Sequence, residues 1–222
     1  MIRLDIFSDP VCPWCYLGKA HLDRALERHP DHPFLIEWHP FQLAPHLPKQ
    51  GVDRGQYLLS IFGTQQRTVD AHLRLAELGR AAGLEFNFEA IKVSPNTFDA
   101  HRLIHWAGLE GRQTPTVSAL FRAYWREGRD IGDPEVLCDL AAEVGMDRKM
   151  ISRLIYSDAD TEALAAREAH ARQRGINAVP TFIVADQHAI SGAQPPELWA
   201  QVIEELAAGG TQPPAEQPGT LQ

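Results

Sequence analysis

Two cysteines separated by two residues, in the segment Cys12-Pro13-Trp14-Cys15, are the residues of this sequence best suited to chemistry. The segment follows an apolar stretch that favours a strand, and a helix-compatible run begins directly behind it. Residues three apart on a helix are neighbours, so the two sulfurs can close a short disulfide. At the helix start, unpaired N–H groups and the positive end of the helix dipole favour the thiolate of Cys12. The spacing therefore predicts a redox-active dithiol, with Cys12 as nucleophile and the more buried Cys15 as resolving thiol.

A zinc site is the alternative use of such a cysteine pair. Zinc would need two further ligands, and no second Cys-x-x-Cys or Cys/His pair follows at a usual spacing. His21 and His39 could join the site only if the fold happened to bring them there. We therefore expect no metal, and no cofactor beyond the dithiol.

Length, composition and charge are those of an ordinary globular protein. The chain has 222 residues, of which 44% are hydrophobic and 23% charged, and its net charge is −8. This charge argues against nucleic acid or an anionic membrane as a partner. The sequence shows no signal peptide and no membrane-spanning stretch, and its third cysteine, Cys138, is unpaired. We expect a cytoplasmic monomer or homodimer without structural disulfides.

Apolar patterns predict the elements that position the dithiol. Strands are expected at 2–7 and 34–39, joined by a helix from Pro13 to about His29, and such a β-α-β unit favours parallel strands. Strand signals return at 179–184 and 189–191, where a hairpin is expected. A last helix is predicted from about Pro195 to Ala208. Between the two groups, from about Gln56 to Gln173, one apolar stripe at helical spacing follows another.

This layout and its motifs resemble the DsbA-like branch of the thioredoxin superfamily, and within it the FrnE-like group of DsbA-family oxidoreductases. The resemblance extends from Asp5 to about Trp199. The motifs that carry it are Asp9-Pro10-Val11-Cys12-Pro13-Trp14-Cys15-Tyr16-Leu17-Gly18, Asn96-Thr97, Ala100-His101-Arg102-Leu103, Val179-Pro180-Thr181-Phe182 and Ser191-Gly192-Ala193-Gln194-Pro195. It implies an α/β, thioredoxin-like fold (β-α-β … β-β-α) interrupted by a large all-helical insertion. We expect a discontinuous thioredoxin-like domain at 1–55 and 174–208, a helical insertion domain at 56–173 and a disordered tail at 209–222.

The resemblance also implies site residues outside the dithiol. Val179-Pro180 would be a cis peptide bond beside the cysteines, and the backbone of the Val179-Pro180-Thr181 loop would pair with an extended substrate. A proline that opens a strand in trans is the alternative. Trp14 and Tyr16 would form an apolar floor for the substrate, or belong simply to the core.

Three polar residues are weaker candidates from the same resemblance. Asp5 lies on the first strand, where related enzymes carry a buried proton acceptor for the resolving cysteine, although an exposed strand-end acid is the equal alternative. Asn96 and His101 lie at the start of a helix expected over the cleft. They could polarise a thiolate or bind the substrate backbone, or they could be a capping Asn and a surface His.

The predicted function is a protein thiol-disulfide oxidoreductase that acts on disulfide- or thiol-containing proteins and peptides, with glutathione as a potential redox partner. The uncharged Trp14 stands where DsbA has a histidine, so we expect a less oxidising pair that acts as a reductase or isomerase. One alternative is a glutathione-dependent isomerase or transferase of the 2-hydroxychromene-2-carboxylate isomerase or kappa type. Those enzymes have serine in place of Cys12, so the intact pair argues against it. The other alternative is a binding module or chaperone that uses the cleft without turnover.

Overall fold

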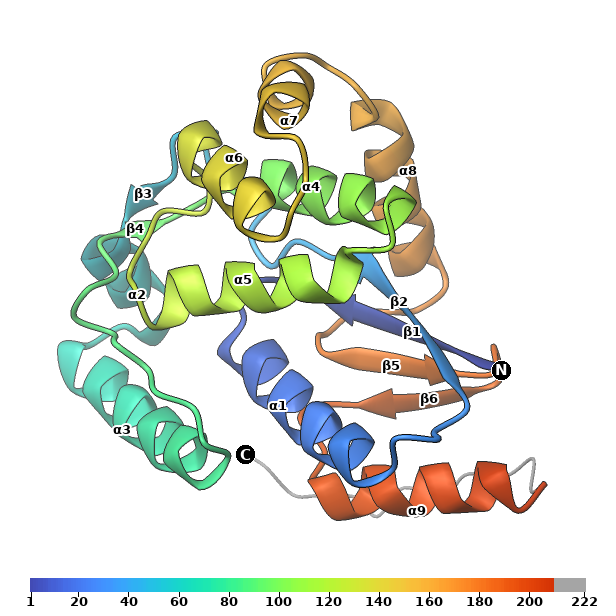
Figure 1. Cartoon of the computed structure of the whole chain (residues 1–222). Helices are drawn as coiled ribbons and strands as arrows, with labels where there is room; N and C mark the ends of the chain where they lie inside the picture. Colours follow the sequence, from blue (N-terminus) through green and yellow to red (C-terminus); the bar gives the residue numbers. More distant parts are fainter. Residues whose placement is uncertain (210–222) are drawn as a thin grey trace.

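The computed structural model describes residues 1–209 and has a four-stranded sheet at its centre (Figure 1). The strands, in the sheet order β2-β1-β5-β6, are β2 (Phe34–Pro40), β1 (Ile2–Ser8), β5 (Thr181–Val184) and β6 (His188–Ser191). β1 and β2 run parallel, as the β-α-β pattern predicts, whereas β5 and β6 each pair antiparallel with their neighbour. Segments from the two ends of the chain therefore share one sheet, which confirms the thioredoxin-like fold.

β1 has different neighbours on its two faces, because successive side chains of a strand point to opposite sides. Leu4 and Ile6 belong to the core formed with α1 (Pro13–Arg28) and α9 (Pro196–Ala207), which lie next to each other in Figure 1. Phe7 points the other way and packs in a separate cluster with α8 (Thr161–Gln173). This alternation decides which residues of β1 can reach the dithiol on α1.

The middle of the chain is mainly helical, as the apolar stripes predict. Its helices before α8 are α2 (Arg54–Phe62), α3 (Gln65–Ala81), α4 (Phe98–Leu109), α5 (Gln113–Trp125), α6 (Pro134–Glu143) and α7 (Arg148–Ile155). The ends follow from local signals. The side chains of Asp133 and Asp147 accept hydrogen bonds from the first N–H groups of α6 and α7, and Gly128 and Gly145 adopt positive φ after α5 and α6.

One feature of this region departs from the all-helical expectation. β3 (Val52–Asp53) and β4 (Val93–Ser94) form a short antiparallel ladder, with Val52 opposite Ser94 and Asp53 opposite Val93. Two residues per strand are too few to produce an alternating pattern in the sequence. The ladder joins the start of α2 to the segment before α4, and both segments border the site described below.

The strands of the four-stranded sheet lie within residues 2–40 and 181–191. The division of the chain into a thioredoxin-like domain and a helical insertion domain stays a prediction. A disordered tail is predicted at 209–222, and residues 210–222 lie outside the described part of the chain. Within residues 1–209, no helix combines the length and the apolar character that crossing a membrane requires.

Candidate active site

The two cysteines occupy the first turn of α1. Cys12 is the N-cap residue, with extended backbone angles (φ −87°, ψ 116°), and Pro13 is the first helical residue. The N–H groups of Cys15 and Tyr16 donate to the carbonyl of Cys12 over 3.1 and 3.2 Å. Both thiols are free and buried, with 3% of Cys12 and 1% of Cys15 exposed. The local sequence thus forms the strand-loop-helix arrangement that a Cys-x-x-Cys pair needs.

Cys15 has the environment of a thiol that keeps its proton. Burial raises the pKa of Cys15 well above its ordinary value, and its hydrogen bond with Cys12 acts in the same direction. The nearby hydroxyl of Ser8 and the backbone N–H of Asp9 oppose this shift in pKa. Ser8 shares the β1 face of Leu4 and Ile6, and the sequence interpretation did not single it out. Cys15 is therefore suited to react second.

The loop before β5 lies directly beside Cys12. The Val179–Pro180 peptide bond is cis, and the thiol of Cys12 donates to the carbonyl oxygen of Val179 over 3.7 Å. The hydroxyl of Thr181 donates to the carbonyl of Ala178 over 2.8 Å and so holds the loop itself. Val179 and Pro180 are thus brought to the dithiol, whereas the side chain of Thr181 is occupied within its own loop.

Pro180 also packs against α1. A Cβ atom added to Gly18 would lie 3.1 Å from Cγ of Pro180, which leaves no spare room between the helix and the loop. Gly18 belongs to the active-site motif that the sequence resemblance quotes, and this close approach is a physical reason for glycine there.

Asp5 does not reach the dithiol, and its suggested role as proton acceptor for Cys15 is wrong for this structure. Its carboxylate is buried and accepts hydrogen bonds from His39 Nε2 over 2.7 Å and from Arg3 Nε over 2.9 Å. Asp5 has the same strand parity as Arg3 and Phe7, so it points to the α8 face rather than to α1. It is neither an exposed strand-end acid nor a cleft residue.

Asn96 positions a loop of the site without facing the cysteines. Its carbonyl oxygen accepts the N–H of Phe98 at the start of α4 and the amide of Gln42, both over 3.0 Å. Its own amide donates to the carbonyl of Leu47 over 2.7 Å. Asn96 thus precedes the N-cap residue Thr97, and its side chain ties the start of α4 to Gln42 and Leu47 of the cavity loop.

His101 is buried and is not the surface residue of the alternative interpretation. It contacts the backbone of Phe41, and desolvation lowers the pKa of His101 to about 3. Its Nε2 has no hydrogen-bond partner and lies 3.8 Å from the carboxylate of Asp9. The described structure shows no hydrogen bond or ion pair between His101 and either cysteine, and its role at the thiolate stays a prediction.

Asp9 is the buried acid nearest to the dithiol along the chain. Its Oδ2 accepts the N–H of Leu43 over 2.7 Å, and its backbone carbonyl accepts the N–H of Cys12 over 2.9 Å. Burial raises the pKa of Asp9 to about 7, against the opposing effect of hydrogen bonds from Leu43, Val11 and Thr97. In the sequence, Asp9 stands out only as the first residue of the active-site motif. Its place three residues before Cys12 was the available signal.

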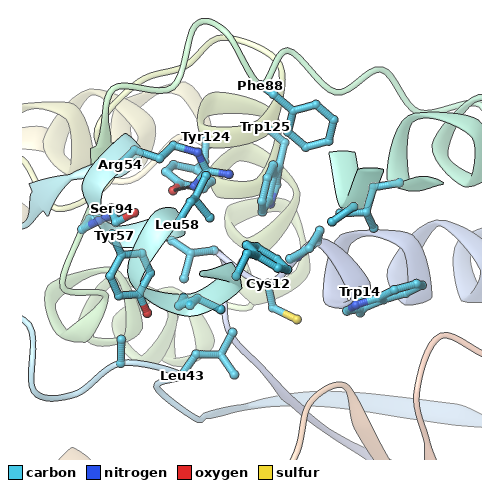
Figure 2. Close-up of a pocket in the computed structure, with 18 of the residues that line it drawn as sticks. Cys12, Trp14, Leu43, Arg54, Tyr57, Leu58, Phe88, Ser94, Tyr124 and Trp125 are labelled. Atoms are coloured by element: carbon cyan, nitrogen blue, oxygen red, sulfur yellow. Dashed lines mark hydrogen bonds between the residues drawn. The ribbon is translucent and has the colours of Figure 1, made fainter. Parts of the chain in front are cut away.

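An apolar cavity of about 400 Å³ opens beside Cys12 (Figure 2). We call it the Cys12 cavity. Its walls come from the active-site segment 11–14, the loop 43–47, parts of α2, α3 and α5, the segment 94–95 and the loop 177–179. Trp14 lines it, as expected of a substrate floor, and Cys12 is the cysteine of the pair that does so. Tyr16 instead stacks on Phe121, with ring centroids 5.1 Å apart.

The histidines considered for a metal site lie elsewhere. His21 contacts the backbone of Gln194. His39 forms, with Asp5 and Glu37, a group whose ligand atoms lie within 4.8 Å of one another. Arg167 contacts both Glu37 and His39 in this group. These donor atoms are already engaged in ion pairs on the α8 face, and none belongs to the dithiol.

A comparison of the sequence with protein families agrees with the thioredoxin-like fold and the Cys-x-x-Cys site. The family model described as "DSBA-like thioredoxin domain" matches residues 3–204. The chain therefore belongs to the DsbA-like thioredoxin family, whose members are disulfide oxidoreductases or isomerases.

Individual relatives agree with this assignment. The chain is 28% identical over 209 residues to the uncharacterised protein YwbO of Bacillus subtilis (strain 168), covering 92% of this chain and 96% of YwbO. A crystal structure of a probable DsbA oxidoreductase, SCO1869 from Streptomyces coelicolor, is 30% identical. It superposes with a TM-score of 0.84 over 99% of this chain and 95% of that one.

Two more distant structures share the fold. One is 2-hydroxychromene-2-carboxylate isomerase, at 18% identity and a TM-score of 0.72, with 93% of this chain and 97% of that chain covered. The other is the cytosolic disulfide reductase DsbM from Pseudomonas aeruginosa with GSH, at 20% identity and a TM-score of 0.67, with 93% and 99% covered.

Proposed function

We propose that this protein is a FrnE-like thiol-disulfide oxidoreductase that works through Cys12 and Cys15. The observation that carries the proposal is the position of Cys12, which is the N-cap residue of α1, lines an apolar cavity and has its sulfur 3.7 Å from the carbonyl oxygen of Val179. A thiolate at a helix start is stabilised by the N–H groups there, and a cavity beside it gives a substrate disulfide access.

The reaction has two exchange steps. The Cys12 thiolate attacks one sulfur of a substrate disulfide, the substrate S–S bond breaks, and the other substrate sulfur leaves as a thiolate that takes up a proton. Cys15 then loses its proton and attacks the Cys12 sulfur, which expels the second substrate thiol. Two electrons have passed to the substrate, and the enzyme holds a Cys12–Cys15 disulfide. An external thiol such as glutathione returns it to the dithiol.

The backbone of Val179 supplies the natural contact for a peptide substrate. Residues 177–179 line the cavity, and the Val179 carbonyl loses its hydrogen-bond donor once Cys12 ionises. That carbonyl is then free to accept an N–H from an extended chain that carries the disulfide.

We further propose a reductase or isomerase that works in the cytoplasm with glutathione as redox partner. Trp14 is uncharged, so the pair lacks the cationic histidine that stabilises the thiolate of DsbA and makes that pair strongly oxidising. The fold likeness to a cytosolic disulfide reductase that was solved with GSH supports the same direction.

The reduction potential of the Cys12–Cys15 pair tests the proposal. The protein is equilibrated in buffers of defined glutathione ratio, alkylated, and read by mass spectrometry. A potential near or below the cytosolic value supports a reductase, whereas a value near that of DsbA overturns the direction proposed here. The Cys138→Ser variant is the control, because Cys138 is buried in α6 and should leave the potential unchanged. Failure to form a Cys12–Cys15 disulfide at any ratio would refute the mechanism itself.

A glutathione-dependent isomerase is the second candidate, supported by the fold likeness to 2-hydroxychromene-2-carboxylate isomerase. Enzymes of that type have serine at the position of Cys12. If this chemistry is latent in the fold, Cys12→Ser protein should isomerise 2-hydroxychromene-2-carboxylate in the presence of glutathione. We expect no turnover, and measurable turnover would favour the second candidate.

A further inference from the structure

Arg54 is a buried cation at the edge of the Cys12 cavity. Its side chain lines the cavity, the residue is 8% exposed, and the described residues provide it with no carboxylate partner. Its Nη1 donates to the hydroxyl of Tyr124 over 2.8 Å, and its Nε has no hydrogen-bond partner. Arginine stays protonated in proteins, and burying such a charge without an anion is costly.

Two aromatic rings are the other neighbours of this charge. The Cζ atom of Arg54 lies 5.7 Å from the ring centroid of Tyr124 and 5.5 Å from that of Trp125. Cation–π contacts offset part of the desolvation, but they leave the N–H of Nε unused. The guanidinium is thus held in place, and the N–H of its Nε remains without an acceptor.

Ser94 adds a second unused polar group to the same cavity. Its hydroxyl is buried and lacks a hydrogen-bond partner, and the residue is part of the cavity wall. The β3–β4 ladder brings Arg54 and Ser94 together, because Arg54 follows Asp53, which pairs with the residue before Ser94. Figure 2 shows Arg54 and Ser94 on one side of the cavity and Cys12 beyond Leu58. A charged end and a nucleophilic sulfur therefore share one cavity.

The rest of the wall selects an apolar body. The residues Leu43, Leu58, Ile61, Phe88 and Trp125 line the same cavity. A volume of about 400 Å³ lies within the range of small-molecule sites, roughly 300–1,000 Å³. A wall of this kind with a few convergent polar groups is typical of a site for one small ligand.

We propose that the Cys12 cavity binds a small molecule with an aromatic or branched apolar body and one anionic group, which Arg54 and Ser94 receive. The proposal that a ligand binds depends only on the cavity. The proposal that such ligands can be disulfide substrates rests on the function proposed above. Low-molecular-weight aromatic acids that carry a disulfide are then substrates. Cys12 attacks their sulfur, one aromatic thiol leaves, and Cys15 releases the other as in the two steps already described.

Binding is tested with two dyes that share one body. 8-Anilinonaphthalene-1-sulfonate carries an anion, and N-phenyl-1-naphthylamine lacks it, and both report binding by fluorescence. We expect Arg54→Met to weaken binding of the sulfonate about tenfold or more, as loss of a charged hydrogen bond predicts, and to leave the neutral dye within about twofold. Arg74→Met, which removes an exposed arginine of α3, should change neither.

Circular dichroism and thermal unfolding show whether a variant is folded. Two further variants separate loss of the anion site from a folding defect. Arg54→Lys keeps the charge and should retain part of the sulfonate affinity. Ser94→Ala removes one hydroxyl and should weaken the sulfonate alone, by about threefold. If all these variants bind both dyes as the wild-type protein does, or lose both dyes equally, the proposal is overturned.

Reaction rates of Cys12 with an anionic and a neutral aromatic disulfide test whether the anion site lies next to this thiol. Reduced protein is mixed with 5,5′-dithiobis(2-nitrobenzoate), an aromatic acid disulfide, and with 4,4′-dithiodipyridine, which is neutral. Arg54→Met should slow the first reaction about tenfold and the second less than twofold. Equal effects on both reagents would overturn the proposal while leaving the dithiol mechanism intact. An unreactive Cys12 in a protein that still binds the sulfonate would refute the proposed function instead.

Discussion

The thiol of Cys12 and the carbonyl of Val179 lie 3.7 Å apart, although 167 residues separate them along the chain. One comes from the first helix and the other from the loop before β5, and the pairing of β1 with β5 holds the two segments together. The surroundings of the Cys12 thiol therefore depend on the pairing of β1 with β5 as well as on the Cys-x-x-Cys motif. A substrate sulfur bound to Cys12 would lie near the backbone of Val179, which links the chemistry of the dithiol to the proposed recognition of the chain that carries the disulfide.

Removal of the resolving thiol should trap the first intermediate. In Cys15→Ser, the mixed disulfide between Cys12 and a substrate has no internal thiol to resolve it, so it should accumulate. Mass spectrometry of protein treated with glutathione disulfide should then show one glutathione bound at Cys12. Cys12→Ser should bind none under the same conditions, because burial raises the pKa of the remaining Cys15 and keeps it as a thiol. Equal labelling of the two variants would contradict the assigned roles.

Asp9 should make the protein less stable as the pH rises. Burial raises the pKa of Asp9 from its ordinary 3.8 to about 7, so the folded state holds this proton more tightly than the unfolded state. The resulting stabilisation is complete below about pH 4 and is lost as the pH rises towards 7. Asp9→Asn cannot ionise. Measured by urea unfolding, its stability relative to wild type should increase between pH 4 and pH 8, by up to about 4 kcal/mol.

The control for this experiment is the surface variant Asp147→Asn. Hydrogen bonds from the N–H groups of Met150 and Lys149 lower the pKa of Asp147, so the sign of its effect is opposite. Its stabilisation is present above the ordinary pKa of 3.8 and is lost only as the pH falls below that value, so the stability difference between Asp147→Asn and wild type should stay nearly constant between pH 4 and pH 8. A flat difference between Asp9→Asn and wild type over the same interval would show that Asp9 is already ionised in the folded protein at pH 4.

A methyl group on Gly18 should disturb the contact between α1 and the Pro180 loop. The new Cβ would lie 3.1 Å from Cγ of Pro180 and 3.4 Å from the Cα of Ala193, so the loop must move by a few tenths of an ångström. We expect Gly18→Ala to lose about 1–2 kcal/mol of stability and to slow the reaction of Cys12. Thermal unfolding and alkylation kinetics measure the two effects.

Gly108→Ala is the matched variant for that prediction. Gly108 is also helical, and its nearest neighbour is the end of the Gln113 side chain at 3.2 Å, which can move at little cost. It should leave the reactivity of Cys12 as in the wild-type protein. If Gly18→Ala also reacts at the wild-type rate, the packing of Pro180 on α1 does not control access to Cys12.

Replacement of Trp14 by histidine should make the dithiol more oxidising. A protonated imidazole between the cysteines stabilises the Cys12 thiolate and with it the reduced form, which raises the reduction potential. Each tenfold change in the equilibrium corresponds to about 30 mV for this two-electron couple. Glutathione equilibration measures the shift, and Trp14→Phe, which also lacks a charge, should stay close to the wild-type value. A lower potential for Trp14→His would refute the role assigned to this position.

Local patterns in the sequence determined the dithiol and most of its frame. Spacing placed Cys12 and Cys15 on the first turn of a helix, alternation predicted β1, and the β-α-β pattern predicted that β2 pairs parallel with it. Asp133 and Asp147 marked helix starts because their side chains satisfy N–H groups only two or three residues away. Each of these features depends on neighbours along the chain, and such features can be recognised from the order of residues alone.

Tertiary structure alone decided which polar groups surround the dithiol. Asp5 and Ser8 both lie on β1, but Ser8 reaches Cys15 because α1 covers that face of the sheet, whereas Asp5 meets His39 on the other. The buried charge of Arg54 and the shifted pKa of Asp9 arise from segments that meet only after folding. Desolvation depends on everything packed around a group, and this information is spread over the whole chain rather than over any one motif.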